Sequence, residues 1–404
     1  MLMSRRLWAG CAAFGTALLL SCGGGDKTGI VYVVGQSDQT VSAFKLNLRT
    51  GVLKTDNNAL VPIGTPAKTG VQPTVLLFNS AQTTAYVADS GSNDIASFSL
   101  NSDGSLKAGG VTPLKHPVSA PVTMTMDPGG KFLFVADQGI PGDPNCGAHP
   151  QNANPCEAGI SIFAVNSGSL TEVPGSPFPL LTGQQTINFP APVIPAGLAV
   201  ANQGNFLYAT DQANNIVLGF SFDGTSGVLT PLTSTMQPAL WPVLVSAGAS
   251  GVFSPPTGDF LYVTTNLQNS NQLFEYKVNS ADGSLTPVPG SPISAGIGPT
   301  VMFSDPSAKF LLVVANRSNQ ILGFRLNQVT GALTALSPAF VSTGDKPVAA
   351  TIRANDVVNG DFWILVSDTG ANTVSTISLI NNTGGMTVQP QINGPVAPFG
   401  IASR

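Results

Sequence analysis

Short apolar runs separated by polar turns recur along the chain, and residues 299–336 show this pattern most plainly. The apolar runs of this stretch are rich in β-branched and aromatic residues and cover 299–303, 310–315, 321–326 and 333–336. The segments between them contain Gly, Pro, Asn, Asp or Ser, which favour tight turns. Strand-length runs bounded by such turns are typical of antiparallel hairpins. We therefore predict that this stretch forms one four-stranded antiparallel sheet.

The same unit repeats at fixed offsets. The central apolar residue of its second run, here called the repeat marker, recurs at Tyr32, Tyr86, Phe134, Tyr208, Tyr262, Leu312 and Leu365. Twelve positions later a second apolar residue follows at Phe44, Phe98, Phe220, Phe274, Phe324 and Ile377, whereas the partner of Phe134 is Phe163. Repeats of one four-stranded unit are typical of β-propellers. The sequence thus predicts an all-β fold, a seven-bladed β-propeller with four-stranded antiparallel blades.

The two ends of the repeat region complement each other. The first copy lacks a first strand, because Ile30 follows directly on a polar linker. The last copy is followed by a surplus apolar run, residues 398–403, that begins with proline like the first strands of other copies. Pairing of this run inside the first blade would leave no unpaired inner edge. We expect residues 30–404 to form one propeller, with its ring closed by the C-terminal strand.

The N-terminal segment has the pattern that is typical of an export signal. Arg5 and Arg6 precede an apolar stretch, residues 7–20, that is too short for a comfortable membrane span. The sequence Leu19-Leu20-Ser21-Cys22 resembles the lipobox of bacterial lipoproteins. This resemblance implies a lipoprotein signal peptide at 1–21, lipidation of Cys22, a flexible tether at 22–29, and a lipid-anchored protein of the cell envelope. Because Gly23 is not Asp, it also implies sorting to the outer membrane, on its periplasmic or surface face; an ordinary secretory signal is the alternative.

Composition excludes several classes of function. Charged residues make up 9% of the chain and the formal net charge is −4, which argues against nucleic-acid binding. The sequence contains no Walker loop, dinucleotide fingerprint, calcium loop or Ser-His-Asp elbow. We expect no cofactor and no metal, and a monomeric protein whose partner besides the membrane is a small molecule or a protein.

Two cysteines remain after Cys11 leaves with the signal and Cys22 is lipidated. An even pair in an exported chain, Cys146 and Cys156, predicts a disulfide. The alternative is a metal site with His149, but this spacing matches no common zinc motif. The pair lies in an insert at 138–159, where the marker interval is 29 residues instead of twelve. We expect an ordered loop above the channel mouth; a neutral surface decoration is the other possibility.

The repeat units resemble the seven-bladed lactonase family, which includes 6-phosphogluconolactonase and muconate-cyclising enzymes. The matching elements are Phe310-Leu311-Leu312-Val313-Val314-Ala315-Asn316, Asp282-Gly283-Ser284-Leu285-Thr286 and Pro289-Gly290-Ser291-Pro292. Tyr262-Val263-Thr264-Thr265-Asn266 also resembles the short YVTN-like repeat of bacterial and archaeal surface propellers. The resemblance implies a catalytic ring of His, Arg and Glu at the channel mouth, beside the starts of the inner strands.

This chain departs from that catalytic ring. The residues expected at the channel mouth are Thr74, Val122, Ala196, Ser250, Thr300, Val348 and Phe399. None of them is an acid, a base or a cation, whereas lactone hydrolysis needs a base for water and a donor for the oxyanion. The glutamate that the resemblance implies in the fourth blade is replaced, at best, by Asp211-Gln212. The sequence therefore predicts that the usual catalytic ring is missing.

Other residues are weaker catalytic candidates. His116, His149 and Lys346 fall on loops at the mouth side, and their convergence would form a site with a histidine base and a lysine anion anchor. Solvated loop residues are the simpler interpretation. Asp211 recurs as Asp89, Asp137 and Asp368 at the end of the second run, which favours a shared role in capping turns.

Two functions remain in competition. The first is a cell-envelope lipoprotein whose propeller binds a ligand or protein without lactonase activity; a structural surface protein is a variant of it. The second is an extracytoplasmic lactonase-like hydrolase with a rearranged site at the mouth. A channel lined by apolar, Ser or Thr side chains favours binding, and clustered His, Lys and Asp side chains favour the enzyme.

Overall fold

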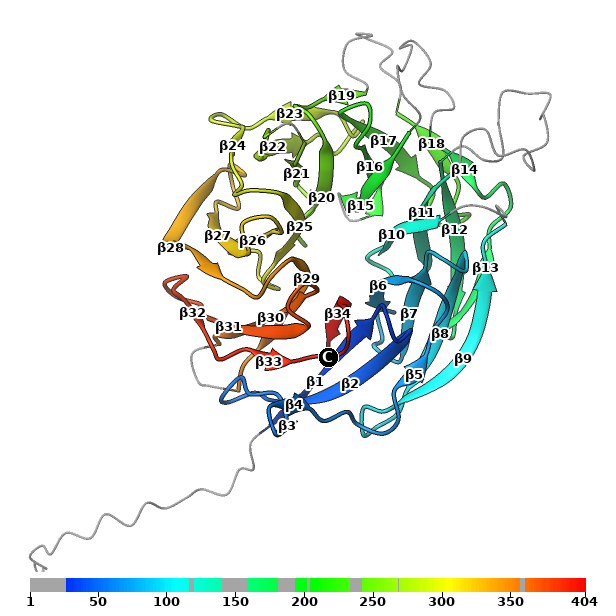
Figure 1. Ribbon diagram of the computed structural model, residues 1–404. Helices are drawn as coiled ribbons and strands as arrows, with labels where there is room; N and C mark the ends of the chain where they lie inside the picture. Colours follow the sequence, from blue (N-terminus) through cyan, green and yellow to red (C-terminus); the bar gives the residue numbers. More distant parts are fainter. Residues whose placement is uncertain are drawn as a thin grey trace, which may run out of the picture.

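The computed structural model describes residues 27–115, 120–139, 158–180, 193–201, 204–232, 242–267, 269–356 and 360–404. These residues form strands and turns, and they contain no α-helix. Accordingly, no described segment is a long apolar helix of the kind that crosses a membrane. The sheets are arranged around an open centre (Figure 1). The predicted all-β propeller is confirmed.

The strands form seven sheets, which we number in chain order. Sheet 1 contains β34 (Pro398–Ser403), β1 (Thr28–Gly35), β2 (Thr40–Asn47) and β5 (Ala67–Lys68). Sheet 2 contains β6 (Pro73–Phe78), β7 (Thr84–Asp89), β8 (Asp94–Leu100) and β9 (Leu106–Pro113). Sheet 3 contains β10 (Ala120–Met126), β11 (Phe132–Gln138), β12 (Gly159–Asn166), β13 (Ser169–Glu172) and β14 (Phe178–Pro179).

Sheet 4 contains β15 (Pro195–Ala201), β16 (Phe206–Asp211), β17 (Ile216–Phe222), β18 (Leu229–Pro231) and β19 (Val243–Leu244). Sheet 5 contains β20 (Ala249–Phe253), β21 (Phe260–Thr265), β22 (Gln272–Val278), β23 (Leu285–Pro287) and β24 (Ile293–Ser294). Sheet 6 contains β25 (Pro299–Ser304), β26 (Phe310–Ala315), β27 (Gln320–Leu326) and β28 (Leu333–Ser342).

Sheet 7 is the largest. It contains β29 (Pro347–Ala354), β30 (Phe362–Asp368), β31 (Thr373–Leu379), β32 (Met386–Val388) and β33 (Ile392–Asn393). A hairpin from the first repeat, β3 (Thr55–Asp56) and β4 (Ala59–Leu60), joins it through the parallel pair Asn393↔Ala59. The first repeat and the last therefore share two sheets.

The prediction of four strands in every sheet is wrong for sheets 3, 4, 5 and 7. In sheets 3 and 5 the outer strand is divided by the sequence Val-Pro-Gly-Ser-Pro, at 173–177 and 288–292. The two halves, such as β23 and β24, pair with different parts of the same third strand. Proline lacks the N–H that a continuous ladder needs, so the strand is interrupted there.

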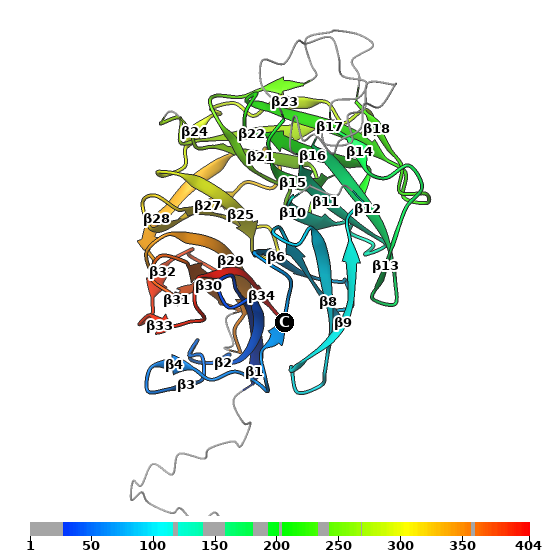
Figure 2. The same cartoon turned by 45° about the vertical axis from the view of Figure 1, so that its right-hand side comes forward.

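The C-terminal strand pairs with the first strand of the chain, as the sequence predicted. Residues Val31, Tyr32 and Val33 of β1 face Ser403, Ala402 and Ile401 of β34 in antiparallel register. Figures 1 and 2 show β34 beside β1 from two directions. Strand β1 begins at Thr28, two residues before the predicted start of the propeller.

The hydrophobic core lies between neighbouring sheets, since each second strand has a sheet on both sides. Every residue of the second strands β7, β16, β21, β26 and β30 is buried. Between sheets 5 and 6, for example, Phe260 and Tyr262 pack with Leu311 and Phe324. This two-sided burial explains why the second runs are continuously apolar instead of alternating.

The tyrosine repeat markers connect adjacent sheets. The Tyr208 hydroxyl donates to the Gly283 carbonyl in the next sheet at 2.6 Å, and Tyr262 does the same to Gly331 at 2.7 Å. Tyr32 and Tyr86 repeat this contact with Gly104 and Gly168. The accepting glycines have positive φ in the outer turns, and a Cβ at Gly331 would meet the Phe260 ring. The marker and the turn glycine of the repeat therefore meet in space.

Candidate binding site at the channel mouth

The seven predicted mouth residues all lie near the starts of the innermost strands. Six of these strands contain a buried proline at or next to their first residue, and buried Ala249 takes its place in β20. The next residue is half-buried in six sheets and buried at Ser250; these residues are Thr74, Val122, Ala196, Ser250, Thr300, Val348 and Phe399. The start of the inner strands thus carries no charge at these positions.

The hydroxyl groups among these residues are engaged in backbone contacts. Thr74 Oγ1 donates to the Ala88 carbonyl at 3.2 Å, and Thr300 Oγ1 donates to the Val314 carbonyl at 3.4 Å. Ser250 Oγ lies 3.0 Å from the Pro299 carbonyl of the next sheet. These three side chains stabilise the inner strands, so they are poorly placed to act as nucleophiles.

A second ring of uncharged polar residues, here called the polar ring, surrounds the mouth. Its members occupy the fourth position after each repeat marker and are Gln36, Ser90, Gln138, Gln212, Asn266, Asn316 and Thr369. Asn316 Nδ2 donates to the Pro347 carbonyl of the next sheet at 2.8 Å, and Thr369 Oγ1 donates to the Pro398 carbonyl at 2.7 Å. Sequence reasoning missed this ring, although its constant offset from the marker was visible.

The recurring aspartates lie one position earlier and are fully buried. Asp211 accepts hydrogen bonds from the backbone N–H groups of Ile194 and Ala213, and from the Asn214 side-chain amide. Burial raises the pKa of Asp211, and these donors offset part of the effect. The predicted turn-capping role is confirmed for this residue. A carboxylate enclosed in this way is unable to touch a substrate.

A match to a known protein family agrees with the propeller fold described above. The family model described as "Lactonase, 7-bladed beta-propeller" matches residues 25–139 and 245–350, which together are more than half of the chain. The chain belongs to this lactonase family. A search of curated proteins finds no match.

Solved structures share the fold at low identity. A proposed 6-phosphogluconolactonase from Bacteroides uniformis is 18% identical, with a TM-score of 0.68 over 93% of this chain and 99% of that one. The periplasmic gluconolactonase of Pseudomonas aeruginosa is 15% identical, with a TM-score of 0.66 over 93% and 99%. At such identities the likeness establishes the fold alone.

One aspartate of this lactonase-family protein has no hydroxyl donor on the third strand of its own sheet. In sheet 7, Asp368 accepts hydrogen bonds from the hydroxyls of Thr373 and Ser375. The corresponding positions of sheet 2 are Asp94 and Ala96, so β8 brings no hydroxyl group to the fully buried Asp89. Burial raises the pKa of Asp89 to about 7; the backbone N–H of Gly70 offsets part of this effect, and the nearby Asp94 carboxylate adds to it.

The remaining catalytic candidates do not form a described cluster. His116, His149 and the cysteines Cys22, Cys146 and Cys156 lie outside the described residues. Lys346 is exposed on the link into sheet 7, whereas Asp211 is enclosed in sheet 4. Within the described part of the chain, no three His, Cys, Asp or Glu side chains gather as they would around a metal ion.

Proposed function

We propose that this lactonase-family protein is an envelope-anchored binding module without lactonase activity, whose ligand, a small molecule or a protein segment, contacts the channel mouth. The observation that carries the proposal is the absence of an ionisable side chain from the seven inner-strand starts and from the polar ring. Side-chain amides and hydroxyls suit uncharged, hydrogen-bonding ligands. The same groups supply neither a base nor a cation for lactone hydrolysis.

The proposal includes a closed ring of seven blades. Its support is the pairing of β34 with β1, the hydrogen bond from Thr369 to Pro398, and the seven-bladed description of the family. On the outer side, the Trp363 indole N–H of sheet 7 donates to the Leu48 carbonyl of sheet 1 at 2.8 Å. A rigid ring holds the mouth residues of all blades in one fixed arrangement.

The proposal also includes the insert at 138–159 as an ordered loop closed by a Cys146–Cys156 disulfide. Its ends support a place at the mouth, because Asp137 and Gly159 are paired where β11 and β12 adjoin the insert. Mass spectrometry of the non-reduced mature protein should find both thiols oxidised. Free thiols, or a stoichiometric metal bound to them, would remove the argument for an ordered loop.

The competing proposal is a lactonase-like hydrolase with a rearranged site. Asp89 favours it, because a pKa of about 7 suits a general base at neutral pH. A structural neighbour described as a periplasmic gluconolactonase also shows that export and this activity are compatible on the fold. Against it, Asp89 is fully buried.

A hydrolysis assay separates the two proposals. Purified mature protein should release acid from 6-phosphogluconolactone and from glucono-1,5-lactone no faster than buffer, beside an active lactonase as positive control. Turnover that survives repurification and disappears in Asp89→Asn, but not in the matched variant Asp137→Asn, would establish the hydrolase instead.

A further inference from the structure

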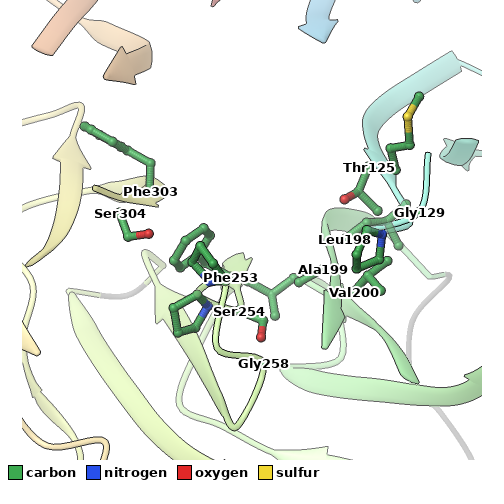
Figure 3. A pocket seen from close by; sticks show the side chains of 15 residues that line it. Thr125, Gly129, Leu198, Ala199, Val200, Phe253, Ser254, Gly258, Phe303 and Ser304 are labelled. Carbon is green, nitrogen blue, oxygen red and sulfur yellow. The ribbon is translucent and has the colours of Figure 1, made fainter. Parts of the chain in front are cut away.

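A large cavity lies at the end of the channel opposite the mouth. Its volume is about 820 Å³, and it is bordered by the last residues of β10, β15, β20 and β25 and by the turns that follow β10 and β20. These inner strands all begin at the mouth, so their last residues lie at the other opening. We call this space the distal cavity (Figure 3).

The wall of the distal cavity is uncharged and largely apolar. None of its fifteen lining residues is ionisable. Phe253 and Phe303 are half-buried, pack against the cores between sheets 5 and 6 and between sheets 6 and 7, and border one side of the space (Figure 3). Leu198 and Val200 pack in the core between sheets 3 and 4 and border the space on the other side. Hydroxyl groups of Thr125, Ser254 and Ser304 are the polar side chains of the wall.

The turn after β20 departs from its counterparts at this wall. In sheets 2, 3 and 6 the turn begins with Asn79, Asp127 or Asp305, and each side chain accepts backbone N–H groups of its own turn. Sheet 5 has Ser254 at this position, and its Oγ is buried without a hydrogen-bond partner among the described residues. Thr257 Oγ1 on the same turn is also unpartnered there.

Unpartnered buried hydroxyls are uncommon in folded proteins, and a ligand group is one way to satisfy them. The cavity volume falls within the range of small-molecule sites. A charged ligand would lose its hydration without gaining a counter-charge from this wall. The two phenyl rings favour a flat apolar body.

We propose that the distal cavity binds an uncharged, ring-containing hydrophobic small molecule that carries a hydroxyl or carbonyl group. The apolar ring lies between the Phe253 and Phe303 side and the Leu198 and Val200 side, and the polar group meets Ser254 Oγ. This site is independent of the proposed function at the mouth, because the two share none of their named residues.

The test uses mature protein and three probes of equal ring size: 2-naphthol, naphthalene and 2-naphthoate. Ligand-observed NMR titrations should give a dissociation constant for 2-naphthol of about 1 mM or tighter. The charged 2-naphthoate should bind at least tenfold more weakly. Ser254→Ala should weaken 2-naphthol binding about five- to tenfold, through the lost hydrogen bond, and leave naphthalene unchanged.

The second part of the test uses a variant whose larger side chain fills the cavity. Val200→Trp should weaken both neutral probes at least tenfold, whereas the matched control Ile352→Trp should stay within twofold of the parent. Ile352 holds the corresponding place in β29 and is half-buried like Val200, but lies outside the cavity wall. Absence of 2-naphthol binding, equal effects of the two Trp variants, or equal affinity for 2-naphthoate would overturn the proposal.

Discussion

At the scale of single residues, the repeat markers contribute more than apolar bulk. Four of the seven are tyrosines whose hydroxyls reach a turn carbonyl of the next sheet, as at Tyr262 and Gly331. Burial raises the pKa of Tyr262, so the hydroxyl stays protonated and remains a donor. Phe134, Leu312 and Leu365 occupy the same position without a donor. The hydrogen bond is thus an addition to packing that is already sufficient in other sheets.

Tyr262→Phe should lower the free energy of unfolding by about 1 kcal/mol, because it leaves the Gly331 carbonyl without its donor. The measurement is chemical denaturation at pH 7. Tyr276→Phe is the control, since this ring stacks on Phe274 within its own sheet. Equal losses in the two variants would show that the inter-sheet hydrogen bond adds nothing.

The pair of Asp89 and Asp94 gives a pH-dependent prediction. The folded pKa of Asp89, about 7, is above the unfolded value of about 4. Between these values the native state binds more protons than the unfolded state, so stability falls as pH rises through this range. Above pH 7 Asp89 is ionised in both states, and the full loss of stability caused by its burial remains.

Asp94→Thr should therefore stabilise the protein, and by more at pH 8 than at pH 4.5. It removes the second carboxylate and restores the hydroxyl donor that Thr373 provides to Asp368 in sheet 7. Urea unfolding at the two pH values measures this, with Asp56→Thr as an exposed control. A loss of stability at pH 8 would mean that Asp94 supports Asp89 instead of opposing it.

At the scale of elements, the local pattern predicted the second and third strands of a sheet well and the outer strand less well. The runs at 310–315 and 321–326 lie within β26 and β27, because two-sided burial demands continuous apolar segments. The division of the outer strand into β23 and β24 depends on how a proline turn sits against the third strand. A strand that faces solvent is specified weakly by its hydrophobic pattern.

Deletion of residues 398–404 should sharply lower the melting temperature. It exposes the edge of β1 and removes the contact of Arg404 N–H with the Ile30 carbonyl at 2.9 Å. Calorimetry of the truncated protein tests this, and a peptide of residues 396–404 added in trans should restore part of the loss. A truncated chain that melts like the full one would contradict ring closure.

At the scale of the whole molecule, the channel has two chemically different openings. The mouth carries amides and hydroxyls such as Gln212 and Asn316, and the distal cavity carries phenyl rings and aliphatic side chains. Both are uncharged at the positions named above, which agrees with the low charge content of the chain.

The proposed envelope address gives the last prediction. Cys22→Ser should release the protein from membranes into the soluble envelope fraction, because the acyl chains supply the anchoring. Cys11→Ser, a change within the predicted signal, should leave the protein with the membranes. Fractionation at high salt provides the measurement, and a Cys22→Ser variant that still sediments with membranes would show that another contact holds it.

The sequence by itself determined the repeat, the strand and turn positions around each marker, and the pairing of residues 398–403 with the start of the chain. These features follow from short-range periodicity and turn chemistry, which depend only on residues that are adjacent in the sequence. The tertiary structure alone decided that Asp89 lies beside a second acid, and that Phe253, Phe303, Leu198 and Val200 border one cavity. Such groupings join residues from different sheets, and their chemistry depends on what neighbouring strands bring to the same point in space.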